Sequence, residues 1–470
     1  MARDGEGKRE LVIVGGGPAG LAAALRAVEA GVRPTLIDER PFPGGRVAGG
    51  HRPAFGLRNP GPPDGDWERQ QRLLSRFRIA RERVEVLQGA VAWGLFEGGE
   101  LGVLHRGRAR PMTAAALVLA TGAHPRAVPF AGWRLAGVVW GDDARARLAA
   151  DGDAPGARVL VAGSGAGLPL LANRLAGAGA AVAGVLEAGA LTDLGWEAHR
   201  LLHRPGLLGD WLRNHLALLR AGIPYRERRV VTAVHGRRRV EEAVVARVDA
   251  AGAPVAGSER LVTCDAVVLD WGAVPETALA RLVDCAHDHD PRRGGWVPRR
   301  TDLLETTQPG IFVAGDAGGL CCQEAAELEG TLAALGALKR LGALGPEDAP
   351  AEIAALRRRL ARLGKVEAVL ARLGAPRPGV WELCPPEEAF CSCQEVRREE
   401  LERYIGEGYR TLDHLKRRSW AATGICQGRI CEPFMAARVA GAEGGHGGAG
   451  GWIRARPPVR PIPFGAFGDR

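Results

Sequence analysis

A glycine turn between a short strand and a helix, near the start of the chain, constrains the fold most. Residues 11–14 are apolar and have the length of a strand, residues 15–20 read Gly-Gly-Gly-Pro-Ala-Gly, and an Ala- and Leu-rich run continues to Ala30. Residues 35–37 form the next apolar segment, and Asp38 closes it. A strand, a glycine turn, a helix and a second strand within this length predict a βαβ unit.

The same turn has the residue types that a dinucleotide pyrophosphate needs. Glycine lets the backbone approach a phosphate closely, and the start of the following helix offers free N–H groups. A carboxylate about 20 residues further on is typical of ribose recognition. The predicted nucleotide ligands are therefore Gly15, Gly17, Pro18, Ala19, Gly20 and Asp38, with Glu39 as an alternative ribose ligand.

A second unit of the same kind begins at Arg158, with predicted strands at residues 159–162 and 182–186 around a helix at residues 168–178. Its turn is less complete than the first, because Leu168 stands where a third glycine would allow close packing of the helix. The candidate NAD ligands in this unit are Gly163, Gly165 and Glu187. The carboxylate favours NADH over NADPH, and a structural relic that binds no nucleotide is the alternative.

Four cysteines near the C-terminus form a predicted metal site. Cys391 and Cys393 are separated by one residue, and Cys426 and Cys431 by four. Four thiolates in two closely spaced pairs suit either a structural zinc ion or an iron-sulfur cluster, and the spacing alone does not decide between them. Cys321-Cys322 could be proposed as a redox pair, but free cysteines more often serve as small buried apolar residues.

Composition and charge exclude several classes of protein. Apolar residues make up 46% and charged residues 25% of the 470 residues, which is typical of a globular protein. The net charge is +9, but the arginines are scattered and no nucleic-acid-binding signature is present, so no nucleic-acid partner is expected. The charged N-terminus resembles no export signal, and every apolar run is shorter than the ~18 residues that cross a bilayer. We therefore expect a soluble, cytoplasmic protein without a membrane span.

Two further strand ends make the pattern specific. Residues 117–122 read Leu-Val-Leu-Ala-Thr-Gly, and residues 311–316 read Ile-Phe-Val-Ala-Gly-Asp. With the first glycine motif, they resemble the two-dinucleotide-domain flavoproteins, the superfamily of glutathione reductase. That resemblance implies that FAD binds at the first motif and that Thr121, Gly122, Gly315 and Asp316 contribute to its site. Arg46 stands where related subunits commonly have glutamine, and it is a further candidate FAD ligand. The disulfide-reducing members use a cysteine pair beside the flavin, whereas this chain has no cysteine before Cys264.

The cysteine-bearing stretch resembles the bacterioferritin-associated-ferredoxin-like 2Fe-2S domain. The Cys-Gln-Gly-Arg sequence at residues 426–429, residues 121–133 and the Arg- and Pro-rich residues 456–463 resemble flavoprotein subunits of hydrogen cyanide synthase and of dye-linked dehydrogenases for proline, hydroxyproline and opines. The resemblance implies an α/β fold with two nested Rossmann-like domains and a small helical C-terminal iron-sulfur domain. The expected division is an FAD-binding domain at residues 10–125 and 300–345, an inserted NAD(P)-binding-like domain at 126–299, a helical connector at 346–383, a 2Fe-2S domain at 384–440 and a Gly/Pro/Arg-rich tail at 441–470 that wraps a surface or a partner.

The function implied is that of an FAD and 2Fe-2S electron-transfer subunit of a multi-subunit amino-acid or amine dehydrogenase. Its expected partner in a hetero-oligomer is an amine-oxidase-like FAD subunit, with a small ferredoxin-like subunit as a further candidate. No catalytic residue can be named from the sequence. A self-contained NADH-dependent reductase and a redox-inactive nucleotide-binding scaffold are the alternatives.

Overall fold

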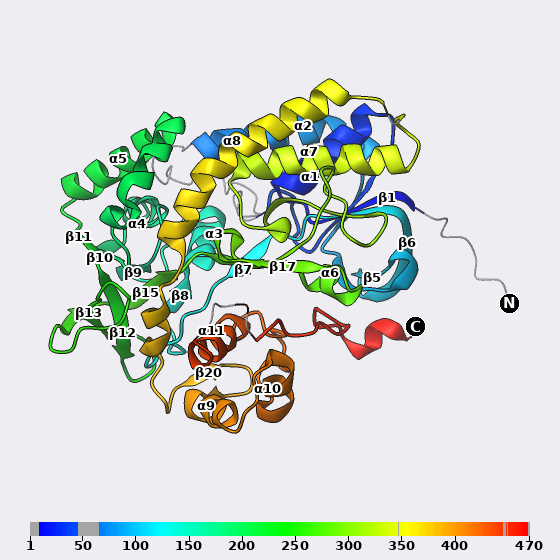
Figure 1. Cartoon of the computed structure of the whole chain (residues 1–470). Coiled ribbons are helices and arrows are strands. Elements are labelled where there is room, and N and C mark those ends of the chain that lie inside the picture. Colours follow the sequence, from blue (N-terminus) through cyan, green and yellow to red (C-terminus); the bar gives the residue numbers. More distant parts are fainter. Residues whose placement is uncertain (1–8, 46–64, 346, 445–447, 449, 469–470) are drawn as a thin grey trace.

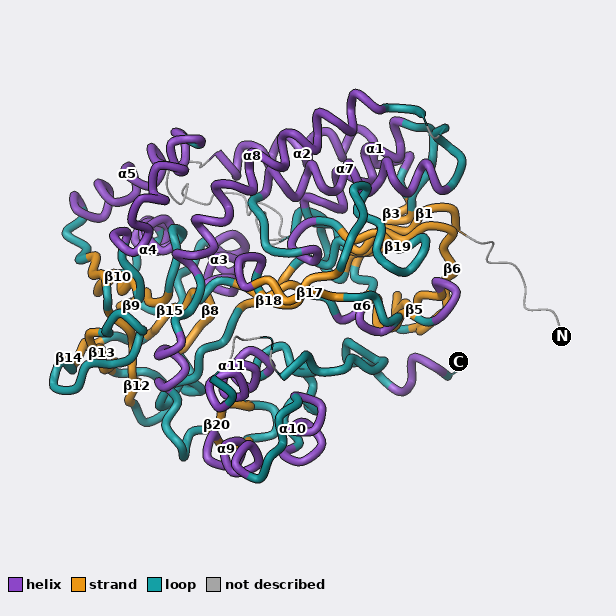
Figure 2. Tube along the Cα trace, in the orientation of Figure 1, coloured by secondary structure: helices purple, strands orange, loops and turns teal. Residues whose placement is uncertain are grey.

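A computed structural model describes residues 9–45, 65–345, 347–444, 448 and 450–468 of the chain. Two α/β domains form the upper part of the molecule in Figure 1, and a small helical domain lies below them. Figure 2 shows the strands of both upper domains flanked by helices, and the loop-rich C-terminal tail returning beneath the first domain. The predicted α/β fold with Rossmann-like sheets is thus confirmed. Arg46, a candidate FAD ligand, lies outside the described residues.

The first domain is built on a seven-stranded sheet. Its strand order is β3-β2-β1-β6-β5-β4, and β19 joins it by pairing in parallel with β6. The strands are β1 (Arg9–Val14), β2 (Thr35–Asp38), β3 (Glu85–Gln88), β4 (Val91–Leu95), β5 (Glu100–His105), β6 (Arg108–Leu119) and β19 (Ile311–Val313). Helices α1 (Pro18–Glu29), α2 (Gly65–Ala80) and α7 (Gln323–Arg340) cover one face of this sheet (Figure 1).

The core of this domain explains its continuous apolar runs. Leu11 and Ile13 of β1 pack with α1 and α7, while Val12 and Val14 face the opposite side with Leu117. A strand that is buried on both faces has no polar side to alternate with, as parallel sheets require. Because β19 follows the second domain in sequence but completes the first sheet, the second domain is inserted into the first.

The inserted domain has a parallel sheet of its own, in the order β11-β10-β9-β15-β8. Its elements are β8 (Val138–Trp140), α3 (Gly141–Asp151), β9 (Arg158–Gly163), α4 (Leu168–Gly177), β10 (Ala181–Glu187), α5 (Pro205–Arg220), β11 (Tyr225–Glu227) and β15 (Ala266–Asp270). An antiparallel sheet packs beside it, made of β12 (Arg229–His235), β13 (Glu242–Arg247) and β14 (Arg260–Thr263).

Two strand pairs and a short helix lie at the junction of the domains. They are β7 (Ala123–Pro125) with β16 (Ala273–Pro275), β17 (His287–Asp290) with β18 (Gly295–Pro298), and α6 (Ala278–Leu282). The connector is α8 (Pro350–Gly374), which runs across both upper domains (Figure 1). The helical domain contains β20 (Ala389–Cys391), β21 (Val396–Arg397), α9 (Arg398–Gly406), α10 (Leu412–Ser419) and α11 (Glu432–Ala442).

The helical domain has its own core and is attached to the upper domains. Phe390 stacks on Phe434 with ring centroids 5.0 Å apart, and the buried Leu401 and Met435 belong to the same cluster. The Trp133 indole N–H of the inserted domain donates to the Ala389 carbonyl at 2.9 Å.

The C-terminal tail packs on its own chain. Ile453 is buried in the core of the helical domain, and Val459 is buried in the core of the first domain. The Val459 N–H donates to the Trp93 carbonyl at 2.8 Å. The surface that the tail was expected to wrap therefore belongs to this chain. No helix among the described residues has both the length and the apolar character that crossing a bilayer would take.

Candidate functional site

The glycines of the first turn serve different purposes. Gly15 has φ +107°, and a Cβ there would meet the Ala120 carbonyl oxygen at 2.1 Å. A Cβ on Gly20 would meet the Gly15 carbonyl oxygen at 1.8 Å. Around Gly17, by contrast, a Cβ would meet nothing closer than the Gly45 Cα at 3.9 Å. The first and third glycines are thus required by the packing of the turn itself, and the second leaves space beside the start of α1.

The two candidate ribose carboxylates also differ. Asp38 is buried, and its two oxygens accept from the Gly16 and Arg40 N–H groups, both at 2.8 Å. Burial raises the pKa of Asp38, while these hydrogen bonds oppose the shift. Glu39 is about half exposed, and its Oε2 lies 3.2 Å from Nε of Arg460. Asp38 therefore holds the glycine turn in shape, and Glu39 is the more exposed of the two carboxylates.

A cavity of about 480 Å³ lies against the turn. Thr121 Oγ1 in its wall donates to the Glu276 carbonyl at 2.7 Å, and Asp316 Oδ1 accepts from the Cys321 N–H at 3.1 Å. Of the sequence-predicted FAD residues, the cavity wall contains Gly15, Gly17, Pro18, Ala19, Asp38, Glu39, Thr121, Gly122, Gly315 and Asp316. Gly20 is not in the wall, because it packs beneath the turn.

Cys321 and Cys322 border the same cavity, but they are poorly suited to redox work. Burial raises the pKa of Cys322 to about 12, and the pKa of Cys321 is raised well above its ordinary value, also by burial and then by Asp316. A thiolate is the reactive form of cysteine, so these thiols are inert at neutral pH.

The second glycine turn is covered by the end of α8. Ser164 Oγ donates to the Gly374 carbonyl at 2.8 Å, and a Cβ on Gly165 would lie 3.7 Å from the Gly374 Cα. Glu187 is buried and accepts from the Gly165 N–H at 3.1 Å and the Gly189 N–H at 3.1 Å. Burial raises the pKa of Glu187 to about 8. The structure thus brings Gly163, Gly165 and Glu187 together, but with a backbone segment against the turn.

The four C-terminal cysteines lie in contact with one another. The Cys431 sulfur lies within hydrogen-bonding reach of the sulfurs of Cys391 and Cys426, and this contact lowers their pKa values to about 6 and about 5. Cys393 is hydrogen-bonded to Cys426 in turn, and this bond contributes to its raised pKa after burial. The four sulfurs, which come from two segments 32 residues apart, therefore converge on one place in the helical domain.

Backbone N–H groups point at these sulfurs. Those of Ala422 and Gln394 reach Cys391, and those of Gly428 and Ile430 reach Cys426. The loop that supplies them is strained, since Ala422 has φ +63° and Gln427 φ +52°. Hydrogen bonds to sulfur are one of the features that tune iron-sulfur clusters.

No three His, Cys, Asp or Glu side chains in the described part of the chain surround a point suited to a single metal ion. A two-iron cluster distributes its four thiolates over two irons, so it does not need three protein ligands around one point. The iron-sulfur assignment therefore stays a prediction.

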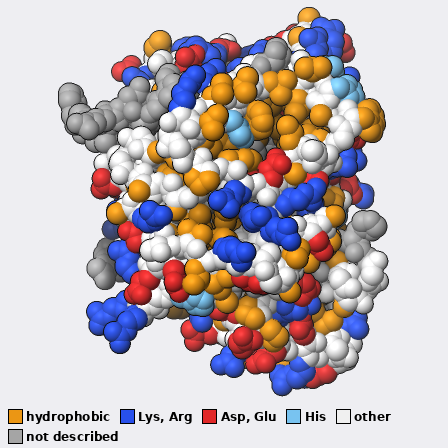
Figure 3. All heavy atoms as spheres, turned by 90° about the vertical axis from the view of Figure 1, so that its left-hand side faces the viewer, with side chains coloured by type: hydrophobic (Ala, Val, Ile, Leu, Met, Phe, Trp, Pro, Cys, Tyr) orange, Lys and Arg blue, Asp and Glu red, His pale blue; other side chains and the backbone are white. Residues whose placement is uncertain are grey.

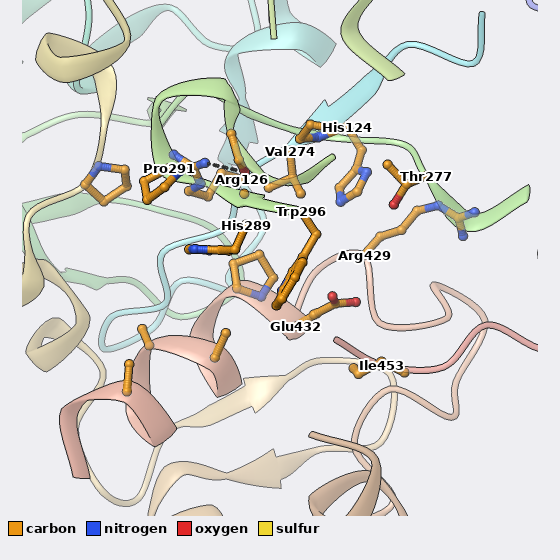
Figure 4. A pocket seen from close by; sticks show the side chains of 18 of the residues that line it. His124, Arg126, Val274, Thr277, His289, Pro291, Trp296, Arg429, Glu432 and Ile453 are labelled. Atoms are coloured by element: carbon orange, nitrogen blue, oxygen red, sulfur yellow. Dashed lines mark hydrogen bonds between the residues drawn. The ribbon is translucent and has the colours of Figure 1, made fainter. Parts of the chain in front are cut away.

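Arg429 connects the cysteine loop to the nucleotide cavity. Its guanidinium pairs with the Glu276 carboxylate, and its Nη1 and Nη2 donate to the carbonyls of Cys426 at 3.1 Å and Val459 at 2.9 Å. Both Glu276 and Arg429 border the 480 Å³ cavity and also a second cavity of about 690 Å³. Figure 4 shows Arg429 at the second cavity. The cations Arg429 and Arg460 outweigh burial and lower the pKa of Glu276 to about 2.

Sequence reasoning missed Glu276 and the role of Val459. Glu276 follows a three-residue strand and lies 153 positions from Arg429, so no local spacing links the two. One signal in the sequence could have pointed to Glu276: it is a carboxylate between the apolar pair Val274-Pro275 and the apolar start of α6.

Comparison with known proteins agrees with this geometry. Residues 9–331 match the family model described as pyridine nucleotide-disulphide oxidoreductase, and residues 387–470 match the sarcosine oxidase A3 domain. The chain is 32% identical to hydrogen cyanide synthase subunit HcnB of Pseudomonas protegens, over 97% of each chain. It is 30% identical to an opine oxidase subunit of Agrobacterium tumefaciens, over 96% of this chain and 90% of the relative.

Among solved structures, the L-proline dehydrogenase from P. horikoshii has the same fold. The TM-score is 0.72 at 22% identity, with 98% of this chain and 80% of the other covered. The glycine turn, the nested sheets and the family match over residues 9–331 agree with one another. The chain belongs to the FAD-dependent pyridine nucleotide-disulphide oxidoreductase family.

Proposed function

We propose that the chain is the FAD- and 2Fe-2S-containing electron-transfer subunit of a multi-subunit amino-acid or amine dehydrogenase of the proline, hydroxyproline, opine or glycine type. The observation that carries the proposal is the convergence of four cysteine sulfurs on a loop whose Arg429 also borders the nucleotide cavity. FAD takes up two electrons and a 2Fe-2S cluster carries one, so a chain that binds both can link two-electron to one-electron transfer.

The first turn supports FAD binding through its shape. The space beside Gly17 would admit the pyrophosphate, and the start of α1 would offer it N–H groups and a favourable dipole. Glu39 would bind the adenosine ribose. Arg460 of the tail lies beside Glu39, and both Val459 and Arg460 border the cavity. The tail therefore closes the adenosine end of the site.

The cysteines and backbone N–H groups of the helical domain support the proposal of a cluster. Cys391, Cys393, Cys426 and Cys431 would hold it, and the backbone N–H groups of the surrounding loops would donate to its sulfurs. Zinc would use the same thiolates, and the spacing of the cysteines does not distinguish the two metals.

Assembly with other proteins is supported by the relatives and by an apolar surface. HcnB and the opine oxidase relative are both named as subunits. In the inserted domain, large apolar side chains lie exposed on α5 and the segment before it: Trp196, Leu202, Leu212, Leu216 and Leu219. Hydrophobic side chains gather near the top of this side of the molecule in Figure 3. Apolar patches of this kind mark protein interfaces, and we assign this one to the amine-oxidising subunit.

The alternative of a self-contained NADH reductase needs an open second turn. Gly374 lies against Gly165 there, and Glu187 is hydrogen-bonded to the turn instead of facing a ribose. A pyrophosphate could reach the turn only if the end of α8 moved away. We therefore propose that the inserted domain has a structural role and binds no nicotinamide nucleotide.

Metal and flavin analysis of the full chain, purified without oxygen, tests the proposal. We expect one FAD and about two irons per chain, with the visible absorbance and electron paramagnetic resonance of a reduced 2Fe-2S cluster. Cys426→Ser should lose the iron and keep the FAD. Cys264→Ala is the matched control, because Cys264 is a buried free thiol of the inserted domain and should leave both unchanged. One zinc and no iron per chain would refute the cluster.

A further inference from the structure

The cavity of about 690 Å³ lies where the upper domains meet the helical domain. Its walls come from the β7–β16 pair, the β17–β18 hairpin, α11 and the tail. Figure 4 shows Arg126 and Pro291 on one side and Arg429 on the other, with Trp296 between them. Neither the predicted FAD ligands nor the four cysteines line it, although it adjoins the nucleotide cavity through His124, Glu276, Ala278, Arg429 and Val459.

Arg126 brings an uncompensated charge into this cavity. Its Nη2 donates to the Gly294 carbonyl at 3.2 Å. Burial alone lowers the pKa of Arg126, to about 10, so the guanidinium remains charged at neutral pH. No carboxylate of the described chain forms an ion pair with it or influences its pKa. A largely enclosed charge whose printed partner is a single carbonyl is costly, which makes this guanidinium a site for an anion.

The other enclosed cations of the cavity have carboxylates beside them. Arg281 lies 3.0 Å from Glu432, and Arg429 pairs with Glu276. Lys416 lies within electrostatic reach of Asp413 and Glu432. Arg438 pairs with Glu382 and Glu402, and Arg454 and Arg456 are exposed. Arg126 is therefore the enclosed cation of the described wall that has no carboxylate beside it, and a single guanidinium suits a monoanion.

A neutral polar group accompanies the charge. His124 Nδ1 is buried without a hydrogen-bond partner, and its distance of 4.0 Å from Glu276 Oε2 is too long for a hydrogen bond. Burial lowers the pKa of His124 to about 4, so the ring is neutral at pH 7. The neutral ring can donate a hydrogen bond to a ligand, or accept one from it, without adding charge.

Much of the remaining wall is apolar. The Trp296 ring is fixed by its N–H, which donates to the Gly451 carbonyl at 3.2 Å, and by edge contact with Trp452 at 4.6 Å between centroids. Helix α11 contributes the small side chains Ala436, Ala437 and Ala440 to the wall. A planar apolar body fits between such surfaces.

We propose that this cavity is a binding site for a small organic monocarboxylate with an apolar body, whose carboxylate pairs with Arg126 and whose body packs on Trp296. A planar guanidinium matches a carboxylate with two parallel hydrogen bonds. The site does not depend on the proposed electron-transfer function, since none of the cysteines or FAD ligands takes part in it.

Binding of benzoate, benzamide and phenyl phosphate to the full chain with its cofactors tests the proposal by titration calorimetry. Benzoate should bind at least about 10-fold more tightly than benzamide, its neutral analogue of the same shape. Arg126→Met should weaken benzoate about 10- to 100-fold and leave benzamide unaffected, and Arg126→Lys should recover part of the loss. Arg237→Met, at an exposed arginine of the inserted domain, is the matched control and should bind like the wild type.

A second readout separates this site from the others. Benzoate should change the tryptophan fluorescence of the wild type, and Trp296→Phe should abolish most of that change while the flavin absorbance stays the same. Equal affinity for benzoate and benzamide, or unchanged benzoate binding by Arg126→Met, would overturn the proposal. Tighter binding of phenyl phosphate than of benzoate would overturn the assignment to a monoanion.

Discussion

The ion pair between Arg429 and Glu276 joins the cysteine-bearing loop to the wall of the nucleotide cavity. Both side chains are largely buried, with exposed fractions of 13% and 9%. Arg460 adds a second cation at 3.5 Å from the same carboxylate. Removing one partner of a buried pair leaves the other charge unpaired and costs about 3–5 kcal/mol. The docking of the helical domain and its tail therefore depends on the charge of Glu276.

This dependence predicts sensitivity to acid. The pKa of Glu276 is about 2 in the folded chain and 4.5 ordinarily, so its contribution is complete above pH 4.5 and is lost as the pH falls toward 2. The contribution is on the order of 3 kcal/mol. Glu276→Gln should lower the unfolding temperature at pH 7, and the difference from the wild type should shrink on acidification below pH 4.5. A difference that does not vary between pH 7 and pH 3 would contradict the assignment.

Gly17 allows a sharper test of nucleotide binding than its neighbours. Its φ is −75°, and a Cβ there would touch no protein atom closer than 3.9 Å. Gly17→Val should therefore fold with a near-normal unfolding temperature in the absence of flavin, yet lose most of its FAD, because the side chain takes the place of the pyrophosphate. Gly20→Val is the contrasting variant and should fail to fold, since its Cβ would overlap the Gly15 carbonyl. Full flavin content in Gly17→Val would contradict the assignment of the turn.

The sequence was most informative where chemistry and local geometry coincide. The βαβ units were predicted correctly because the apolar segments, the glycine turn and the closing carboxylate of each unit lie within about 30 residues. The bounds of β1, α1 and β2 differ from the predicted segments by a residue or two. The pairing of β19 with β6 was not predicted, because it joins segments almost 200 positions apart. Long-range pairing leaves no local period in a sequence.

In the candidate sites, too, the sequence predicted the local features and missed the long-range contacts. Ten of the predicted FAD residues line one cavity, since most of them follow strands whose ends meet at one edge of the sheet. The covering of the Gly165 turn by Gly374 could not be predicted, because it depends on where a 25-residue helix ends in space. The pairing of Glu276 with Arg429 and the lone charge of Arg126 depend in the same way on how three domains pack.

Glu187 should make the inserted domain less stable at high pH. Burial raises its pKa to about 8 from 4.5, so folding favours the protonated form, and stability that is complete below pH 4.5 is lost as the pH rises through 8. Glu187→Gln removes this titration and keeps an oxygen for the Gly165 N–H. We expect its unfolding temperature to match the wild type near pH 5 and to exceed it at pH 8.5, measured by calorimetry. If the variant is less stable than the wild type at both pH values, the carboxylate is ionised in the fold.

The tail should stabilise the first domain. Its Val459 N–H pairs with β4, its Val459 carbonyl accepts from Arg429, and Arg460 lies beside Glu39. Truncation after Ala455 should therefore lower both the unfolding temperature and the affinity for FAD, whereas assembly with a partner should be affected only through this loss. Arg456→Ala is the control, because Arg456 is exposed. Unchanged flavin affinity in the truncated chain would show that the tail does not close the site.

The exposed apolar face of α5 should be needed for assembly with the amine-oxidising subunit. Leu212, Leu216 and Leu219 are 53%, 39% and 75% exposed, and their spacing places them on one side of the helix. Charges at such positions cost little in the isolated chain but prevent burial in an interface. The double substitution Leu212→Glu and Leu219→Glu should leave flavin content and unfolding temperature unchanged. The substituted chain should no longer co-elute with its co-expressed partner, and dye-linked dehydrogenase activity should fall at least about 10-fold.

Ile79→Glu is the matched control: Ile79 is 84% exposed at the end of α2, and the substitution should leave the complex intact. Co-elution of the doubly substituted chain at wild-type levels would mean that the partner docks elsewhere.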